Sequence, residues 1–261
     1  MSTFKKYAAM SAAILSLGAA PAYAADMIQD PVVEVAPFSG WYLRGDLGMS
    51  NQQFDHLDYV GFADPAYHTF FNDGDFDAGI TAQIGVGYQF NDWFRADVTG
   101  QYRGKTDFSA LDFYDIDGDL STTDDAATNE YHAKKSEWLF LANAYADLGT
   151  YAGFTPYVGA GIGASRNTIS GFVDNNIITG GGGWAGSDSQ WELALALHTG
   201  VGIKATDRMT IDLGYSYVHL GDGQTADASN FISSQTRADP EPFKFKDIVS
   251  HDFKVGARYV F

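Results

Sequence analysis

The sequence contains no cysteine in 261 residues, so an exported fold would hold together without disulfides and would carry no lipid on an amino-terminal cysteine. No stretch after residue 24 approaches the roughly 18 apolar residues that a membrane-spanning helix requires. Basic side chains are scarce, with 16 Lys and Arg against 33 Asp and Glu and a formal net charge of -17. Because so acidic a chain repels phosphate backbones, nucleic acid is excluded as a partner.

The amino-terminal segment has the features of a secretory signal. Two lysines precede an apolar stretch over residues 7–20, and the small-residue sequence Pro-Ala-Tyr-Ala follows and ends at Ala24. This pattern predicts removal on export, with cleavage after Ala24 and cleavage after Ala25 as the alternative. The expected division of the chain is a signal peptide over 1–24, a periplasmic leader over 25–39 and a single domain over 40–261.

The carboxy-terminal residues alternate strictly in polarity. Successive side chains of a strand point to opposite faces, so an apolar face opposes a polar one: Phe253, Val255, Ala257, Tyr259 and Phe261 against Asp252, Lys254, Gly256 and Arg258. Such a strand requires hydrocarbon on one side and polar groups on the other. A transmembrane β-barrel supplies both environments. The 29 glycines and 15% aromatic residues also suit a soluble acidic β-sandwich. The choice between a barrel and a sandwich therefore rests on the alternation of polarity and not on the composition.

Period-two alternation recurs in eight segments of about ten residues, each long enough to cross a bilayer at a tilt. They cover residues 41–50, 80–90, 94–103, 137–147, 157–165, 191–204, 209–217 and 251–261. Short connections at 91–92, 149–154 and 206–208 alternate with long ones at 52–76, 106–135, 168–188 and 221–247. Short periplasmic turns and long outer loops are typical of outer-membrane barrels. The sequence therefore predicts an all-β fold: an eight-stranded, antiparallel, up-and-down, closed transmembrane β-barrel with four long acidic extracellular loops.

The alternation also assigns charged side chains to the barrel interior. Six are positive and seven are negative: Arg44, Arg95, Arg103, Lys204, Lys254 and Arg258 with Asp46, Asp97, Glu137, Asp147, Glu192, Asp212 and Asp252. An eight-stranded barrel is just wide enough for side chains to fill, and an unpaired buried charge is costly. The near balance predicts a paired network that plugs the barrel. A narrow pore lined by the same charges is the alternative.

Aromatic side chains are expected at the two membrane interfaces. The outward-facing rings near the ends of the predicted strands are Trp41, Tyr88, Phe90, Trp138, Trp191, Tyr215 and Tyr217. Amphipathic rings settle at the level of the lipid headgroups. Each ring alone is weak evidence, because Tyr and Trp also fill soluble cores.

Two segments resemble a known family. Gly-Trp-Tyr-Leu-Arg-Gly-Asp-Leu-Gly over residues 40–48 and Ala-Arg-Tyr-Val-Phe over 257–261 are similar to the first and last strands of small alphaproteobacterial surface antigens, the porin-family or opacity-like β-barrel proteins. The resemblance implies an eight-stranded barrel of the OmpA/OmpX type in the outer membrane of a Gram-negative bacterium. It also implies that the barrel assembly machinery reads the terminal aromatic residues Tyr259 and Phe261. The family motif carries no catalytic residue, so no enzyme activity, cofactor or metal site is expected.

Several candidate sites remain as minor alternatives. His198 shares the predicted inner face with Glu192, but no serine completes a hydrolase site in the sequence reading. The aspartate-rich stretches 72–77 and 112–119 invite a calcium site, although neither fits the spacing of an EF-hand loop. Scattered loop His and Tyr residues would permit haem binding. The expected function is a structural surface antigen in contact with outer-membrane lipid and lipopolysaccharide; a small porin and a loop-based receptor or adhesin for haem, a cation or a host molecule are the alternatives.

Overall fold

The computed structural model describes residues 39–62, 68–115, 126–177, 180–231 and 241–261. The expected signal peptide, and the leader up to residue 38, lie outside the described residues. No helix in the described ranges is long and apolar enough to cross a membrane.

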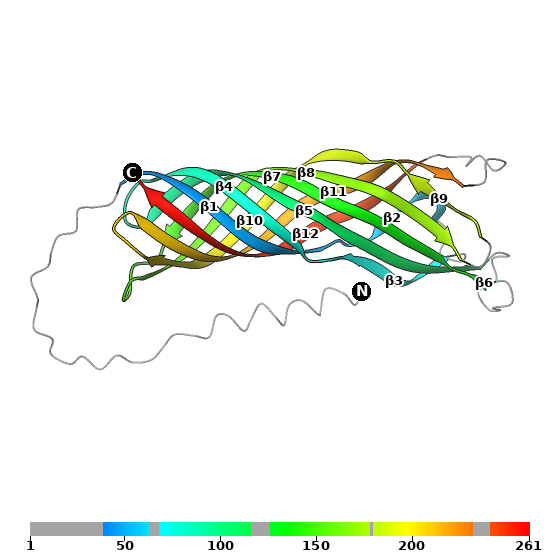
Figure 1. The fold of residues 1–261 in the computed structure, drawn as a ribbon, viewed down its shortest axis with the longest axis horizontal. Coiled ribbons are helices and arrows are strands. Elements are labelled where there is room, and N and C mark those ends of the chain that lie inside the picture. The colour runs from blue at the N-terminus through cyan, green and yellow to red at the C-terminus, as the bar shows by residue number, and fades with distance from the viewer. Residues whose placement is uncertain (1–38, 63–67, 116–125, 178–179, 232–240) are drawn as a thin grey trace, which may run out of the picture. The chain divides into compact units, whose positions relative to one another are not determined.

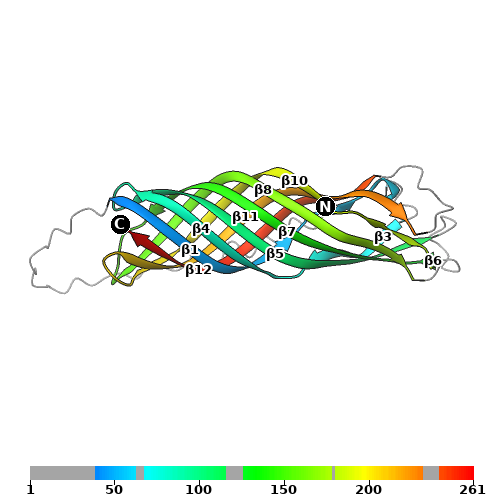
Figure 2. The same ribbon diagram turned by 45° about the horizontal axis from the view of Figure 1, so that its top comes forward.

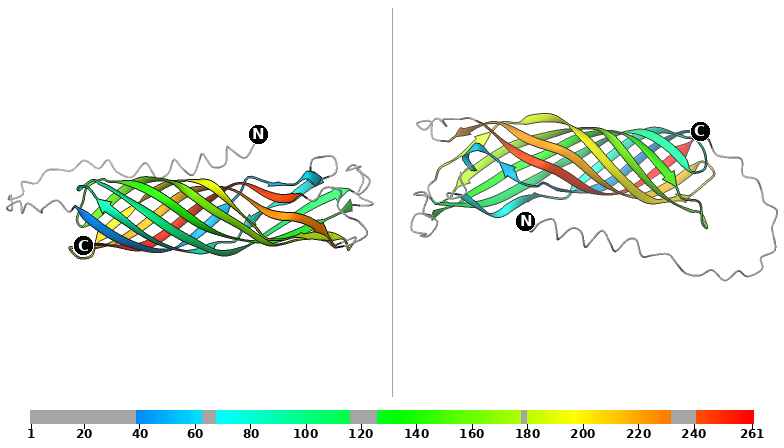
Figure 3. Two further views of the ribbon diagram at one scale, coloured as in Figure 1. Left: turned by 90° about the horizontal axis from the view of Figure 1, so that it is seen from above. Right: turned by 180° about the vertical axis from the view of Figure 1, so that it is seen from behind.

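Eight long strands run in chain order around a closed ring (Figure 1). They are β1 (Gly40–Gln53), β4 (Gly79–Gln89), β5 (Phe94–Asp115), β7 (Asn129–Asp147), β8 (Phe154–Asn176), β10 (Asp188–Lys204), β11 (Met209–Asn230) and β12 (Pro242–Val260). Each pairs antiparallel with its neighbours, and β12 closes the ring because it pairs with both β1 and β11. Figures 2 and 3 show the same steady tilt of the strands from other directions. The predicted all-β, eight-stranded antiparallel barrel is confirmed.

Short elements complete the sheet at the end that carries the long connections. They are β2 (Leu57–Asp58), the 3-10 turn η1 (Val60–Phe62), β3 (His68–Phe76), β6 (Ala126–Ala127) and β9 (Gly182–Ala185). The strand β3 extends the wall above β4 by pairing with β5, and β9 pairs with both β8 and β11.

Short turns gather at the opposite end, beside the carboxyl terminus (Figure 1). Between β4 and β5 the side chain of Asn91 accepts hydrogen bonds from the backbone N–H groups of Trp93 and Phe94. Between β10 and β11, Thr206 caps the N–H groups of Arg208 and Met209 in the same way. Side-chain oxygens of Asn and Thr favour such turns because they replace the missing backbone partners. Tight links of this kind are typical of the periplasmic end of outer-membrane barrels.

The four predicted long loops are each more than half strand, which corrects the prediction. The segments expected as loops at 106–135, 168–188 and 221–247 are occupied largely by continuations of β5, β7, β8, β11 and β12. β-Bulges explain the error. The inner face of β5 passes from Arg103 to Thr106, and the register of β8 shifts near Gly171, where φ is +61°. Each extra residue reverses the parity of the alternation, so the pattern seems to stop where the strand in fact continues.

The barrel has two halves with opposite patterns of polarity. In the membrane half, apolar side chains face outward up to a rim formed by Met49, Ile80, Tyr102, Trp138, Ala164, Trp191, Tyr217 and Phe253. In the outer half, which comprises the described residues of 51–76, 106–136, 166–190 and 219–250, outward positions such as Asp107 and Ser109 are polar and exposed. Many of the inward positions there are apolar, such as Phe108, which is 1% exposed, and Asp112, Lys135 and Asn167 are buried polar residues of the same half.

Aromatic rings fill the interior of the outer half. This aromatic core consists of Phe54, Tyr59, Phe62, Phe70, Phe76, Phe108, Tyr131, Phe172, Phe243 and Phe245. Phe243 lies at its centre, stacked on Tyr59 and on Phe172 with ring centroids 4.2 Å apart in both pairs. Phe54 reaches in from the end of β1 and meets Phe245 at 5.5 Å. The segment after β1, predicted as part of an outer loop, therefore packs into the barrel.

Candidate functional site

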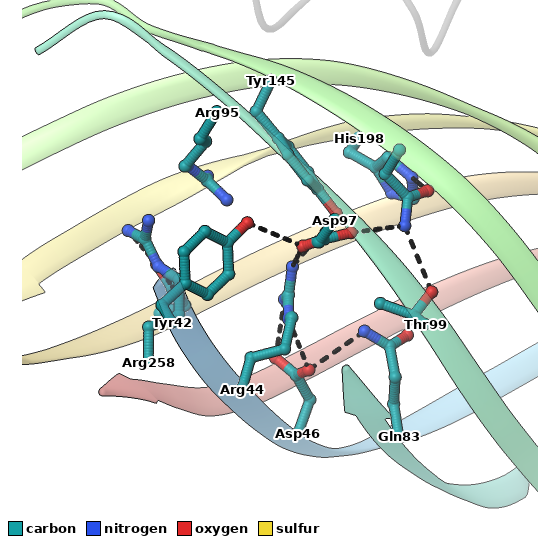
Figure 4. A network of polar contacts seen from close by, with 12 residues as sticks. Tyr42, Arg44, Asp46, Gln83, Arg95, Asp97, Thr99, Tyr145, His198 and Arg258 are labelled. Atoms are coloured by element: carbon teal, nitrogen blue, oxygen red, sulfur yellow. Dashed lines mark hydrogen bonds and ion pairs between the residues drawn. The ribbon is translucent and has the colours of Figure 1, made fainter. Parts of the chain in front are cut away.

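The interior of the membrane half is a network of charged side chains centred on Arg44 (Figure 4). The Arg44 guanidinium contacts Asp46 Oδ1 at 2.8 Å and Asp97 Oδ2 at 3.1 Å. It also donates to the Tyr145 hydroxyl at 3.0 Å. Tyr42 donates to the same Asp97 oxygen at 3.0 Å. Asp97 on β5 is thus shared by two side chains of β1, which links strands that are not adjacent in the wall.

The periplasmic end of the interior is closed by two further arginines. Arg95 donates to Asp147 at 3.1 Å and lies with its guanidinium carbon 4.0 Å from the Tyr145 ring centroid and 4.8 Å from that of Tyr157. Arg258 contacts Asp212 at 2.6 Å. Stacking on aromatic faces suits the planar, weakly hydrated guanidinium.

The outer end of the network contains a residue that the sequence reading missed. Arg103 bridges Glu137 and Asp252, the latter at 2.5 Å. Lys135 pairs with Glu137 and donates to Gln52 Oε1 at 2.6 Å, with its side chain fully buried. The predicted strand begins at residue 137, so the sequence places Lys135 in a loop. Its position inside the barrel depends on the extension of β7 toward the outer side.

Two predicted interior charges do not belong to the buried ion pairs. Lys204 is exposed at the periplasmic rim and pairs with Asp207 in the turn at 3.3 Å. As the last residue of β10, its long side chain reaches past the mouth of the barrel to solvent. Glu192 points inward but is only half-buried. Its side chain packs against Gly221 and occupies the space that a Cβ there would need.

The remaining predicted charges come together, and the described part of this interior is balanced. Ion pairs join five cations and six carboxylates, and a sixth cation, Lys254, donates to Gln83 Oε1 at 3.3 Å. The charge network is thus Arg44, Arg95, Arg103, Lys135, Lys254 and Arg258 with Asp46, Asp97, Glu137, Asp147, Asp212 and Asp252.

His198 lies inside this network in a chain of polar contacts that the sequence did not reveal. Its Nδ1 is 2.8 Å from Ser216 Oγ and its Nε2 is 3.0 Å from Asn143 Oδ1. The Asn143 amide donates to Asp97 at 2.7 Å, which turns its oxygen toward His198. Nε2 therefore carries the proton, and Nδ1 accepts from the Ser216 hydroxyl. These contacts form only because β7, β10 and β11 meet across the interior.

This serine, histidine and asparagine resemble the parts of a hydrolase, but the site lacks access. Ser216 is 2% exposed. The cavity beside it, lined by Arg44, His198, Ser216 and Lys254 among others, measures about 10 Å³. That volume accommodates about one water molecule. An acyl substrate has no room to approach the hydroxyl, so the three side chains act as members of the polar network.

Glycines on the inner face make room for the large polar side chains. A Cβ on Gly161 would lie 2.2 Å from Asn143 Oδ1, and a Cβ on Gly87 would lie 2.4 Å from the Tyr42 ring. The absence of a side chain at Gly161 and Gly87 therefore leaves the space that Asn143 and Tyr42 occupy.

The outer half offers different chemistry. The Tyr131 hydroxyl donates to Asp112 at 2.6 Å, and Asp112 also accepts from the Asn129 backbone. Burial raises the pKa of the Tyr131 phenol, and the carboxylates of Asp174 and Asp112 raise it further. The phenol therefore stays protonated and holds the buried carboxylate at the edge of the aromatic core.

The candidate metal and haem ligands do not converge in the described ranges. No three His, Cys, Asp or Glu side chains come together there in a way that would hold a metal ion. His56 contacts Asp55, His132 contacts Glu130, and His219 contacts Asp247, each on a different outward position. Residues 116–119, the second half of the second aspartate-rich stretch, lie outside the described residues.

Outward aromatic residues occupy both edges of the apolar band. Trp41, Tyr88 and Phe90 lie near the periplasmic turns, with Trp41 and Tyr88 5.4 Å apart. Trp138, Trp191, Tyr215 and Tyr217 lie toward the outer edge. Tyr259 and Phe261 are exposed beside Trp41, whose carbonyl accepts from the Phe261 backbone. The interfacial role of these rings and the assembly role of the terminal pair stay predictions.

Comparison with known proteins agrees with this architecture. A family model for the outer membrane protein beta-barrel domain matches residues 10–261. The chain belongs to this outer-membrane β-barrel family. An uncharacterised protein of Brucella abortus is 34% identical over 92% of this chain and 93% of that protein. Outer membrane protein PagN of Salmonella typhimurium is 28% identical over 68% of this chain and 71% of its own length.

A third relative carries a more specific name. A candidate adhesin of Rickettsia bellii is 26% identical over 84% of this chain and 87% of its own length. Family membership and relatives named as outer-membrane proteins place this outer-membrane barrel in the outer membrane. The outward band of apolar residues in the membrane half is therefore the surface that contacts lipid.

Proposed function

We propose that this outer-membrane barrel is a closed, non-conducting surface protein of the adhesin type. Its rigid outer half provides the surface that contacts other molecules. The observation that carries the proposal is the aromatic core of the outer half. A barrel that served only to occupy the membrane would need no packed core beyond the lipid, and a porin would need an open interior. The solid outer half instead supports a surface that other molecules can touch.

Closure at two levels disfavours the small-porin alternative. The charge network fills the membrane half and leaves a cavity of about 10 Å³ at its centre. Above it, ten aromatic side chains fill the outer half. An ion would have to displace both layers, and separating buried ion pairs is costly. Planar-bilayer recordings are expected to show no steady channels. Reproducible single-channel steps from pure protein would contradict the proposal.

The outer half also raises its connecting loops well above the lipid. From Tyr102 at the rim to Asp115 at the end of β5 the strand adds 13 residues, which corresponds to a height of about 30 Å at the usual rise and tilt. The four outer segments, 51–78, 105–136, 166–190 and 219–250, contain 21 Asp and Glu against seven Lys and Arg. We infer that a strongly acidic surface is presented at this distance from the membrane.

The relatives favour contact with other surfaces over a purely structural role. The candidate adhesin of Rickettsia bellii aligns over most of both chains, and its name motivates the adhesin class for this chain. A receptor role for haem or a metal has less support, because the candidate ligands are scattered in the described ranges.

Adhesion tests the proposal directly. The protein would be displayed on a non-adherent Gram-negative host, beside a variant in which residues 116–125 and 232–240 are replaced by short Gly-Ser links. The full chain is expected to raise attachment to cultured host cells at least about tenfold, and the trimmed variant should lose that gain while keeping heat-modifiable migration on gels. Attachment equal to that of the empty host would contradict the proposal.

The assembly machinery and lipopolysaccharide are proposed as the remaining partners. The support for the first is the exposed terminal pair Tyr259 and Phe261. Deletion of Phe261 should lower the amount of barrel in the outer membrane several-fold, whereas Tyr151→Ala, at an exposed aromatic residue of a periplasmic turn, should not. Equal surface levels of all three proteins would contradict the role of the terminal aromatic residue.

A further inference from the structure

A patch of side chains on the outward face lies at the outer edge of the apolar band, across β7, β8 and β10. The strand register places Arg166 directly between Trp138 on one side and Trp191 on the other. Side chains directly opposite each other on one face of a sheet lie about 5 Å apart at Cβ. One cation is thus flanked by two indole rings.

Hydroxyl groups form the next row of the same patch, on the side away from the hydrocarbon. The register pairs Ser136 with Thr168 and Thr168 with Ser189. Thr168 Oγ1 and Ser189 Oγ are 2.9 Å apart. Three hydroxyls on adjacent strands therefore lie one step above Arg166. Because Thr168 and Ser189 are hydrogen-bonded to each other, one of their two protons is already used, and two of the three hydroxyls can donate to an acceptor held there.

Arg166 is exposed and has no carboxylate partner in the part of the chain that the structure describes. Its neighbour in the patch, Lys134, is already paired with Asp107 at 2.5 Å. Lys105 is exposed in the bulge of β5, opposite Ser136. In a chain with twice as many acids as bases, an unpaired arginine at the edge of hydrocarbon stands out. A cation at this depth is costly unless it meets an anion or reaches the headgroup layer.

We propose that Arg166, with the hydroxyl row above it, binds the phosphate group of a lipid in the outer leaflet. The guanidinium presents paired N–H donors that match phosphate oxygens, and charge-assisted hydrogen bonds of this kind are strong. The two tryptophans keep this site at the depth of the membrane interface. Below the row, exposed Phe140 and Leu193 offer an apolar wall for the acyl chains.

Native mass spectrometry of the purified barrel in zwitterionic detergent tests the site with three probes: bisphosphorylated lipid A, the same lipid without phosphates, and inorganic phosphate. Arg166→Gln is expected to weaken lipid A binding about tenfold, the loss of one to two charge-assisted hydrogen bonds. The matched control Arg208→Gln, at an exposed arginine of a periplasmic turn, should bind like the unaltered protein. Heat-modifiable migration verifies that each variant is folded.

The probes separate a lipid site from a site for any anion. Lipid without phosphates should bind the unaltered protein no better than lipid A binds Arg166→Gln, and millimolar inorganic phosphate should not displace lipid A. The proposal is overturned if Arg166→Gln binds lipid A normally, if both variants lose equally, or if inorganic phosphate competes. Should Arg166→Gln fail to fold, Arg166→Lys provides the same comparison, with a smaller loss of about threefold because the paired donors are gone and the charge remains.

Discussion

In the membrane half, β5 turns Val98 outward and Arg103 inward; a few residues further along the same strand, Asp107 faces out and Phe108 faces in. Lipid surrounds the barrel at the first pair of residues and water surrounds it at the second. The outward side chain is therefore apolar at Val98 and charged at Asp107. The interior therefore takes whatever chemistry the surroundings do not supply, which is paired charge within the membrane and an apolar core above it. In β5 the exchange follows the extra residue of the bulge between Arg103 and Thr106.

The largest expected effect breaks the charged interior. Arg103→Ala would leave Glu137 and Asp252 buried without their shared partner, which is expected to cost about 3–5 kcal/mol of unfolding free energy. Lys204→Ala removes a cation at the exposed rim, where an ion pair contributes about 0–1 kcal/mol. Urea unfolding in detergent micelles measures both. Similar small losses in the two variants would contradict a network that holds the membrane half together.

A substitution in the aromatic core should loosen the outer half alone. Phe243→Ala removes the ring that stacks on Tyr59 and Phe172, with an expected cost of about 3 kcal/mol. Limited proteolysis should then cut the outer half while the membrane half keeps its heat-modifiable migration. If heating instead unfolds both halves of the variant together at a lower temperature, and the protease does not cut the outer half first, the two halves form one cooperative unit.

Outward positions sharpen the same comparison. Leu47→Arg places a charge in the lipid-facing band, where about 2–4 kcal/mol is expected near the midplane. Ser109→Arg places the same side chain on the water-facing surface of the outer half and should change stability by less than about 0.5 kcal/mol. Equal costs in unfolding experiments in lipid vesicles would mean that both positions share one solvent.

The smallest predicted change concerns the polar edge of the aromatic core. Tyr131→Phe removes the hydrogen bond to the buried Asp112 carboxylate, and about 1.5 kcal/mol should be lost. Tyr151→Phe, at a tyrosine that is 69% exposed, is the matched control and should leave stability unchanged. Hydrogen exchange at the outer ends of β5 and β7 reports the loss, and unchanged protection there would show that the contact contributes little.

Sequence alternation predicted the membrane half closely because lipid enforces it without interruption. The 80–90 segment, where Ile80, Ile84 and Val86 all face outward, coincides with β4 to within one residue at each end. The outer half escaped prediction because the bulges at Lys105 and Gly171 reverse the parity, and because its apolar positions face inward rather than out. Nothing in the local pattern distinguishes such a segment from a loop.

The sequence predicts which residues belong to the charge network, but it does not predict which of them contact each other. Eleven of its twelve members follow from parity within segments whose alternation is clean. Lys135 was missed since it lies beyond the recognised part of β7, and Lys204 was misplaced because parity alone does not say where the barrel mouth ends. The contacts of His198 with Ser216 and Asn143 depend on the register between strands, which a single sequence does not contain.

The most direct test of the inversion uses the absence of cysteine from the chain. Single cysteines at Val98, Tyr102, Asp107, Phe108 and Ser109 would carry spin labels in lipid vesicles, and relaxation by oxygen would be compared with relaxation by a water-soluble nickel complex. The labels at 98 and 102 should respond to oxygen, those at 107 and 109 to nickel, and the label at 108 should be immobile and shielded from both. Oxygen-dominated relaxation at 107 and 109, or a mobile, nickel-accessible label at 108, would contradict a solid outer half surrounded by water.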